Sequence, residues 1–283
     1  MRIEESRVQD SSQRLRPKPP ARHTLTGNFV VHKDFPSIYL EKDRTIIVYL
    51  PPDYERNLRK RYPVLYMHDG QNLFDGATSF IPGVEWRMDE TAEELISNGE
   101  IEPMIIVGIY NTGESRLDEY TFIKDWRGRG GKADDYAKMI IEELKPFIDA
   151  KYRTLRTPEH TGVGGSSLGG LVSLYFGLRY NEVFGKLAIL SPSTWWAGKA
   201  IVKEVAKIKR KPNQKIWLDV GLKEDMHTMV SPTRLLKYSL IAKGWELDED
   251  LLYFEAPNSG HSESDWAKRV GPMLRFLFPV QMK

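Results

Sequence analysis

The sequence contains no cysteine. Disulfide bonds, thiolate metal sites, a cysteine nucleophile and thiol-based redox sensing are therefore excluded, while the redox compartment stays open. No stretch approaches the roughly 20 apolar residues that a membrane helix needs, and residues 1–7 lack the apolar core of a signal peptide. We therefore expect a cytoplasmic protein with no membrane partner.

An excess of charge of either sign is also lacking. The chain has 41 Lys and Arg against 39 Asp and Glu, and the net charge of +2 is too small to hold a polyanion. Nucleic acid is therefore not an expected partner. With 283 residues, 41% of them hydrophobic, the chain suits one large domain, which we expect over 23–283. Residues 1–22 lack periodicity and are expected to form a flexible extension.

Strand and helix patterns alternate along the rest of the chain. Residues 25–32 and 44–50 are extended runs, which predict an antiparallel pair at a sheet edge. Short apolar runs predict buried strands, and amphipathic runs predict helices between them. The predicted strands cover 63–68, 104–110, 160–164, 187–190, 215–220 and 251–255, and the predicted helices cover 86–98, 133–148, 168–180, 199–209, 232–243 and 265–278. This alternation indicates an α/β fold with a mostly parallel central sheet and helices on both faces.

The sharpest motif is the pentapeptide Gly-Ser-Ser-Leu-Gly at 165–169, between a predicted strand and a predicted helix. In this context a G-x-S-x-G sequence predicts a nucleophile elbow, in which the glycines permit a tight turn and Ser167 projects at the helix N-terminus. The alternative is a glycine-rich helix start with an inert serine N-cap. A P-loop is excluded because no lysine follows the last glycine, and a dinucleotide fingerprint from Gly162 meets Ser167 where its third glycine belongs.

A serine nucleophile needs a base, and His261 is the best placed of the six histidines. It follows the predicted strand 251–255 and precedes the last helix, which places it at the same carboxyl edge of the sheet as Ser167. The alternative is a polar loop histidine with no role in catalysis. The other five histidines are expected to be structural, and among them His68 is the one expected to border the site.

The acid and the oxyanion donors are expected in loops at the same edge. A carboxylate that orients the imidazole should follow the strand 215–220, where Glu224 is preferred and Asp225 is the alternative. An oxyanion hole needs the amide after the nucleophile, which belongs to Leu168, and a second amide from the loop after the third strand. The amide of Gln71 is the candidate there, and an ordinary turn is the alternative.

Two further groups of side chains could contact a substrate. Residues 111–132 form a connection that is long for a compact domain, and long ordered loops are usually functional. Within it, Arg116 and Glu119 either bind a polar substrate or form a loop ion pair, and the ion pair is preferred. Trp195 and Trp196 follow the strand next to the nucleophile strand. They either wall a pocket for an acyl or sugar group or pack against the core.

Four strings in the chain carry a family resemblance. They are Val-Leu-Tyr-Met-His-Asp-Gly-Gln at 64–71, Gly-Gly-Ser-Ser-Leu-Gly-Gly at 164–170, Leu-Ser-Pro-Ser-Thr-Trp-Trp at 190–196 and Asn-Ser-Gly-His at 258–261. With these strings the chain resembles the Putative Esterase family of α/β hydrolases, which includes enterochelin esterase-like proteins, esterase D, feruloyl and acetyl xylan esterases and mycolyl transferases. The resemblance covers roughly residues 25–277.

The resemblance implies an α/β-hydrolase fold with serine chemistry. It implies Ser167 as nucleophile, His261 as base and the amides of Gln71 and Leu168 as oxyanion donors. Members of the family use either Asp or Glu as the acid, so Glu224 is admissible. The order of nucleophile, acid and histidine along the chain is that of the same fold.

The preferred function is therefore hydrolysis of a carboxylic ester through an acyl-enzyme that water resolves. Short acyl, sugar and hydroxycinnamoyl esters all fit as substrates. Acyl transfer at the same site and a non-catalytic binding role on the same fold are the alternatives. No metal or organic cofactor is needed. A small-molecule ester is the expected partner, and the oligomeric state is not readable from the sequence.

Overall fold

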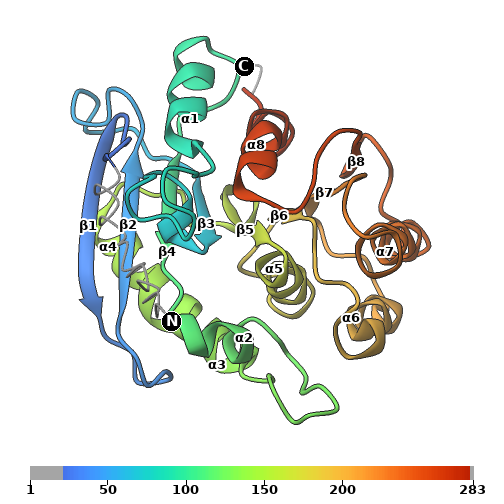
Figure 1. The fold of residues 1–283 in the computed structure, drawn as a ribbon. Helices are drawn as coiled ribbons and strands as arrows, with labels where there is room; N and C mark the ends of the chain where they lie inside the picture. The colour runs from blue at the N-terminus through green and yellow to red at the C-terminus, as the bar shows by residue number, and fades with distance from the viewer. Residues whose placement is uncertain (1–21, 281–283) are drawn as a thin grey trace, which may run out of the picture.

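The computed structural model describes residues 22–280, so the expected extension over 1–22 lies almost wholly outside the described residues. The described chain builds one sheet of eight strands (Figure 1). In chain order they are β1 (Asn28–Phe35), β2 (Arg44–Leu50), β3 (Val64–His68), β4 (Ile105–Ile109), β5 (Thr161–Ser166), β6 (Lys186–Leu190), β7 (Lys215–Gly221) and β8 (Leu251–Ala256).

The strands lie across the sheet in the order β1-β2-β4-β3-β5-β6-β7-β8. The pairs β1–β2 and β2–β4 are antiparallel, and every other neighbouring pair is parallel. The predicted mostly parallel sheet with an antiparallel N-terminal edge is confirmed. All residues of β3, β4 and β5 are buried, as expected for strands covered on both faces.

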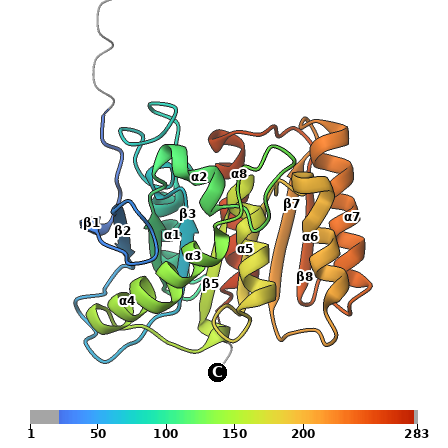
Figure 2. The ribbon, with the colours of Figure 1, turned by 90° about the horizontal axis from the view of Figure 1, so that it is seen from below.

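Helices cover both faces of the sheet (Figures 1 and 2). They are α1 (Met88–Ser97), α2 (Arg116–Glu119), α3 (Ala133–Lys138), α4 (Lys145–Lys151), α5 (Leu168–Arg179), α6 (Trp196–Lys207), α7 (Ser231–Ile241) and α8 (Glu263–Leu277). Short helical turns lie between them at Gly70–Asn72, Gly113–Ser115, Met139–Leu144, Pro158–His160 and Met226–Val230. One large apolar cluster joins α1 and α8 to one face of the sheet, and another joins the helices from α3 to α7 to the opposite face.

Most predicted boundaries differ from the structure by one to three residues, and two of these differences have a clear local cause. The helix expected over 133–148 runs on to Lys151 and contains a wide π-type turn at Met139–Leu144. Pro146 lies in the first turn of α4, directly after the π-type turn. A proline has no N–H group, so it cannot donate the hydrogen bond that a regular helix would make to the preceding turn. The first strand begins at Asn28 rather than at residue 25, because the amides of Thr24 and Thr26 bind side chains instead of a strand.

The carboxyl ends of the parallel strands determine where chemistry can occur. Strands β3, β5, β7 and β8 run in the same direction, so the segments that follow them meet at one edge of the sheet. Those segments carry Gln71, Ser167, Glu224 and His261, respectively. The topology therefore brings four residues that are far apart in the sequence to a common edge.

Candidate active site

Ser167 occupies a strained turn between β5 and α5. Its backbone has φ 58° and ψ −121°, a conformation that costs a non-glycine residue energy and persists only where the surroundings hold it. The amide of Ser167 donates to the carbonyl of Leu190 at 3.1 Å, and the amide of Ser193 donates to the carbonyl of Ser167 at 2.9 Å. The segment after β6 therefore holds the turn on both sides.

Gly165, the first glycine of the motif, lies in a closely packed place. A Cβ at Gly165 would lie 3.2 Å from the Cα of Gly169 and 3.2 Å from the Cβ of His68. Such contacts are tighter than side chains normally make, so a larger residue would push α5 away from β3. The predicted strand-turn-helix context of the G-x-S-x-G motif is thus present in the structure.

Glu224 and His261 lie within hydrogen-bond distance in the loops after β7 and β8. The Nδ1 atom of His261 is 2.8 Å from Oε2 of Glu224, whose side chain is fully buried. Because an ionised carboxylate only accepts hydrogen bonds, Nδ1 carries the proton, and Nε2 is left as the basic nitrogen of the neutral ring. Trp266 packs against the imidazole edge to face at 4.9 Å.

The hydroxyl of Ser167 contacts a second serine in this structure. Its Oγ lies 3.2 Å from Oγ of Ser193, which is buried. Among the described residues, no hydrogen bond joins Ser167 to His261. Hydrogen bonds of this kind are often long in a ligand-free enzyme and tighten when substrate binds, so the two side chains stay candidate partners.

Asp225, the alternative acid, has a different task. Its Oδ1 accepts hydrogen bonds from the amides of His227 and Thr228 and thereby caps the turn Met226–Val230. The residue is exposed, whereas its neighbour Glu224 points inward to His261. The geometry therefore favours Glu224 as the partner of the histidine.

The turn after β3 places Gln71 beside the candidate nucleophile turn. Asp69 adopts a left-handed conformation with φ 57°, and Gly70–Asn72 then forms a single 3₁₀ turn. Neither the amide of Gln71 nor that of Leu168 donates a hydrogen bond to another group of the described chain. Both amides are therefore free to bind an oxyanion.

Arg116 and Glu119 do not form the expected ion pair with each other. Arg116 donates two hydrogen bonds to the carboxylate of Asp69, at 2.8 and 2.7 Å. Glu119 instead accepts from both terminal nitrogens of Arg44, at 3.2 and 3.1 Å, in a buried pair. The reason is burial: Arg44 and Asp69 are removed from water, and a buried charge needs a partner of the opposite sign.

His68 lies beneath the nucleophile turn and is only 1% exposed. Its Nδ1 is 2.8 Å from the hydroxyl of Tyr136. Burial lowers the pKa of His68 to about 3, so the ring is neutral at physiological pH. The residue lies against the nucleophile turn at Gly165 and supports it from below, and its burial leaves no side-chain surface for a substrate.

The two tryptophans expected near the site have different surroundings. Trp196 is buried, and its Nε1 donates to the carbonyl of Ile123 at 2.8 Å, which fastens the long loop after α2. Trp195 is 42% exposed and comes two residues after Ser193. Of the two rings, only Trp195 is open to a ligand.

Three residues near the candidate site were not predicted from the sequence. Ser191 and Ser193 belong to the string 190–196, but nothing in the string says which hydroxyl faces the site. The structure places Ser191 against Glu224 and Ser193 against Ser167. Asp69 was also missed, although its place before Gly70 is the signal for a tight turn.

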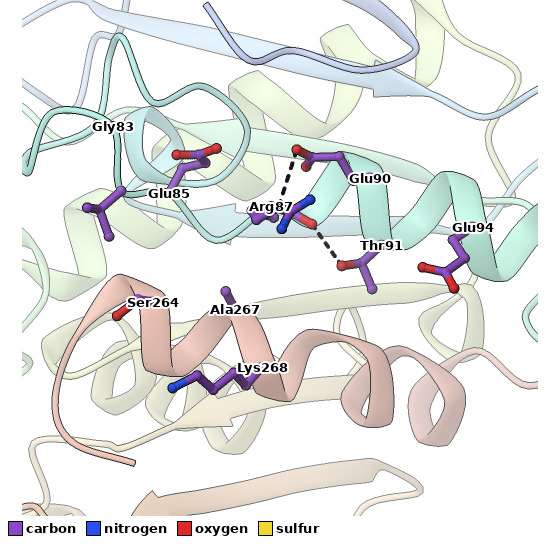
Figure 3. A pocket seen from close by; sticks show the side chains of 10 residues that line it. Gly83, Glu85, Arg87, Glu90, Thr91, Glu94, Ser264, Ala267 and Lys268 are labelled. Atoms are coloured by element: carbon purple, nitrogen blue, oxygen red, sulfur yellow. Dashed lines mark hydrogen bonds and ion pairs between the residues drawn. The ribbon is translucent and has the colours of Figure 1, made fainter. Parts of the chain in front are cut away.

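A separate cleft of about 550 Å³ opens between α1 and α8 (Figure 3). Its walls carry carboxylates and cations side by side, from Glu85, Arg87, Glu90, Glu94 and Lys268. Among the described residues that line it, none is Ser167, Glu224 or His261. The cleft is therefore distinct from the candidate active site, and we assign it no role.

Comparison with known proteins identifies the family. A family model described as "Putative esterase" matches residues 37–277. The chain belongs to this esterase family. The family match, together with a feruloyl esterase among the relatives, makes this chain a carboxylesterase-type hydrolase. This result confirms the activity class that the sequence predicts.

Individual relatives are similar to the esterase over most of its length. The uncharacterized protein YbbA of Bacillus subtilis (strain 168) is 27% identical over 248 residues, which are 83% of the esterase and 93% of YbbA. An endo-1,4-beta-xylanase/feruloyl esterase of Xylanibacter ruminicola is 31% identical over 242 residues, covering 84% of the esterase and 30% of that protein. The crystal structure of the BES protein from Bacillus cereus superposes with a TM-score of 0.69 at 22% identity, covering 99% and 100% of the two chains, and supports the fold.

Two further features of the esterase concern metals and membranes. Within residues 22–280, no group of three or more His, Asp or Glu side chains is arranged to hold a metal ion. In the same range, no helix combines the length and the apolar character needed to cross a membrane.

Proposed function

We propose that the esterase hydrolyses small carboxylic esters with Ser167 as nucleophile, His261 as general base and Glu224 as the acid that orients the histidine. Nε2 of His261 takes the proton from the Ser167 hydroxyl as Oγ attacks the ester carbonyl carbon. The same nitrogen then returns the proton to the departing alcohol, which leaves an acyl-enzyme. Water, activated in the same way, releases the acid and restores the serine.

The negative charge that develops on the carbonyl oxygen needs donors that are already in place. The amides of Leu168 and Gln71 fit this role, because both are free of protein hydrogen bonds and both lie at the turns that flank the nucleophile. The Asp69–Arg116 pair fastens the turn that carries Gln71. Preorganised donors of this kind typically contribute a factor of about 10² to 10³ to turnover.

The observation that carries the proposal is the strained backbone of Ser167 beside a buried Glu224–His261 pair. A serine at φ 58° has an energetic cost that an inert helix cap does not need. A fully buried carboxylate that binds a partly exposed imidazole at 2.8 Å leaves Nε2 of the ring available to take the proton of the Ser167 hydroxyl.

The acyl or alcohol group of the substrate would lie against the exposed face of Trp195. This ring is 42% exposed and comes two residues after Ser193, whose hydroxyl contacts that of Ser167, and both observations support this placement. The similarity to a feruloyl esterase makes hydroxycinnamoyl esters worth testing beside short acyl and sugar esters.

The test is hydrolysis of p-nitrophenyl esters from acetate to laurate by the wild type and by Ser167→Ala. We expect serine-dependent turnover with an optimum of acyl length, and a loss on the order of 10⁴ to 10⁶ in kcat for the variant, because members of such a triad act as a unit. Circular dichroism and thermal unfolding should be unchanged. Activity of Ser167→Ala within tenfold of the wild type would reject the mechanism.

A further inference from the structure

Ser191 lies where the candidate acid needs support. It directly follows β6, is fully buried and has a left-handed backbone with φ 41°. Its Oγ is 2.5 Å from Oε1 of Glu224, the carboxylate oxygen that does not face His261. The amide of Gly221 donates to the same oxygen at 2.8 Å.

The neighbours of Ser191 determine the direction of its hydroxyl proton. Nη2 of Arg269 and Nε1 of Trp266 each lie 3.2 Å from the Ser191 oxygen. Arginine and the indole nitrogen can only donate, so the Ser191 oxygen accepts both of these bonds. Its single proton is therefore directed to Glu224, in a short hydrogen bond to a charged group.

We propose that Ser191, oriented by Arg269 and Trp266, is a positioning residue that holds the Glu224 carboxylate toward His261. This inference rests on the proposed roles of Glu224 and His261. Ser191 touches neither the substrate nor the reacting atoms, and it acts through Glu224. Its hydroxyl gives Oε1 a second donor beside the Gly221 amide, and together with the His261 contact at Oε2 these bonds hold the carboxylate in one orientation.

The support of Ser191 is itself rigid. Nη1 of Arg269 binds Oδ1 of the buried Asp219 at 2.7 Å, and Nε1 of Trp217 donates to the other carboxylate oxygen at 2.6 Å. The amide of Ser191 also donates to Asp219, at 3.1 Å. Arg269 is thus fixed by a paired charge in the interior, and it fixes the serine in turn.

The same segment of chain serves the nucleophile. Leu190 accepts from the Ser167 amide, and Ser193 contacts the Ser167 backbone and hydroxyl. Ser191 lies between these two residues and binds the acid. A displacement of this segment would move the nucleophile and the acid together, so the experiment must separate the Ser191 hydroxyl from its backbone.

Two variants make that separation. Ser191→Ala removes the hydroxyl and keeps the Cβ, and Ser191→Gly removes the hydroxyl while favouring the left-handed backbone. For both we expect kcat to fall on the order of 10- to 100-fold, the factor carried by a hydrogen bond to a charged group, with KM within about twofold of the wild type. A merely structural defect would not spare KM and would be milder in the glycine variant.

A double-mutant cycle with Glu224→Gln tests whether Ser191 affects kcat through Glu224. If Ser191 acts through Glu224, Ser191→Ala lowers kcat by less than about threefold when Glu224 is already Gln. A full 10- to 100-fold further loss in that background would overturn the inference, because Ser191 would then act independently.

Thr161→Val is the matched control. Thr161 is also fully buried, and its hydroxyl donates to the carbonyl of Thr157 at 3.0 Å, but it opens β5 at the end remote from Ser167. We expect it to change stability and leave kcat unchanged. If both Ser191 variants keep wild-type kcat while Glu224→Gln is impaired, the positioning role is rejected and the proposed function stands. If the wild type shows no Ser167-dependent hydrolysis, the proposed function itself fails.

Discussion

At the scale of single residues, the adjacent acids Glu224 and Asp225 have opposite surroundings and different roles. Glu224 turns inward to a histidine, and Asp225 turns outward to cap the next helical turn. Burial favours the neutral acid, but hydrogen bonds from His261, Ser191 and Gly221 outweigh it and hold the pKa of Glu224 below its usual value. The carboxylate therefore stays ionised at physiological pH, as an orienting partner must.

This difference predicts unequal effects of two conservative substitutions. Glu224→Gln should lower kcat on the order of 10³ to 10⁴, because a neutral amide can present its nitrogen to the imidazole and favour the wrong tautomer. The loss should persist from about pH 6 to 9, since Glu224 is ionised throughout that range. Asp225→Asn should keep kcat within about threefold. Steady-state kinetics of both variants on one ester decides the acid, and the reverse ranking would exclude Glu224.

At the scale of elements, the turn after β3 depends on how closely it approaches β4. A Cβ at Gly70 would lie 2.5 Å from the carbonyl carbon of Gly108 and 2.7 Å from the nitrogen of Ile109, and neither backbone can yield easily. Gly70→Ala should therefore move the turn that carries the Gln71 amide. We expect a loss on the order of 10² in kcat and of about 1 to 3 kcal/mol in unfolding free energy, measured by kinetics and urea denaturation.

A glycine in α8 provides the control for that substitution. A Cβ at Gly271 would meet the guanidinium end of Arg275 at 3.3 Å, and this flexible end can move. Alanine is the better helix former, but residue 271 precedes Pro272, whose ring opposes a Cβ on a helical residue before it. Gly271→Ala should therefore change the unfolding free energy by less than about 1 kcal/mol and leave kcat unchanged. Equal losses in the two variants would show that the turn at Gly70 has no special role.

At the scale of the whole molecule, the order of strands and helices along the chain predicts the position of the site, but it does not predict which side chains pair with one another. The alternation of strands and helices places Ser167, Glu224 and His261 at one sheet edge, because parallel strands end on the same side. The partners of Glu119 could not be predicted in this way, because Arg44 is 75 residues distant along the chain. Arg269 is 78 residues from Ser191, and only the packing of α8 on the sheet brings them together.

Stability is also a property of the whole molecule, and Asp89 in α1 should make it depend on pH. Its carboxylate accepts from the amide of Thr26 at 2.6 Å and so ties the first described residues to the body. Burial, with a further contribution from Glu90, raises the pKa of Asp89 to about 8. An acid with a raised pKa stabilises the fold fully below its unfolded value near 3.8, and this stability is lost as pH rises through about 8.

Asp89→Asn removes this titration while its side-chain oxygen can still accept from Thr26. The melting temperature of the variant minus that of the wild type should therefore increase by about 2 °C or more as pH rises from 4 to 9. Differential scanning calorimetry of both proteins across this pH range measures the difference between their melting temperatures. Because all other groups titrate alike in the two proteins, their contributions cancel in this difference. A difference that stays constant with pH would mean that Asp89 is ionised in the folded protein throughout, and that the Thr26 amide and the solvent suffice to hold its charge.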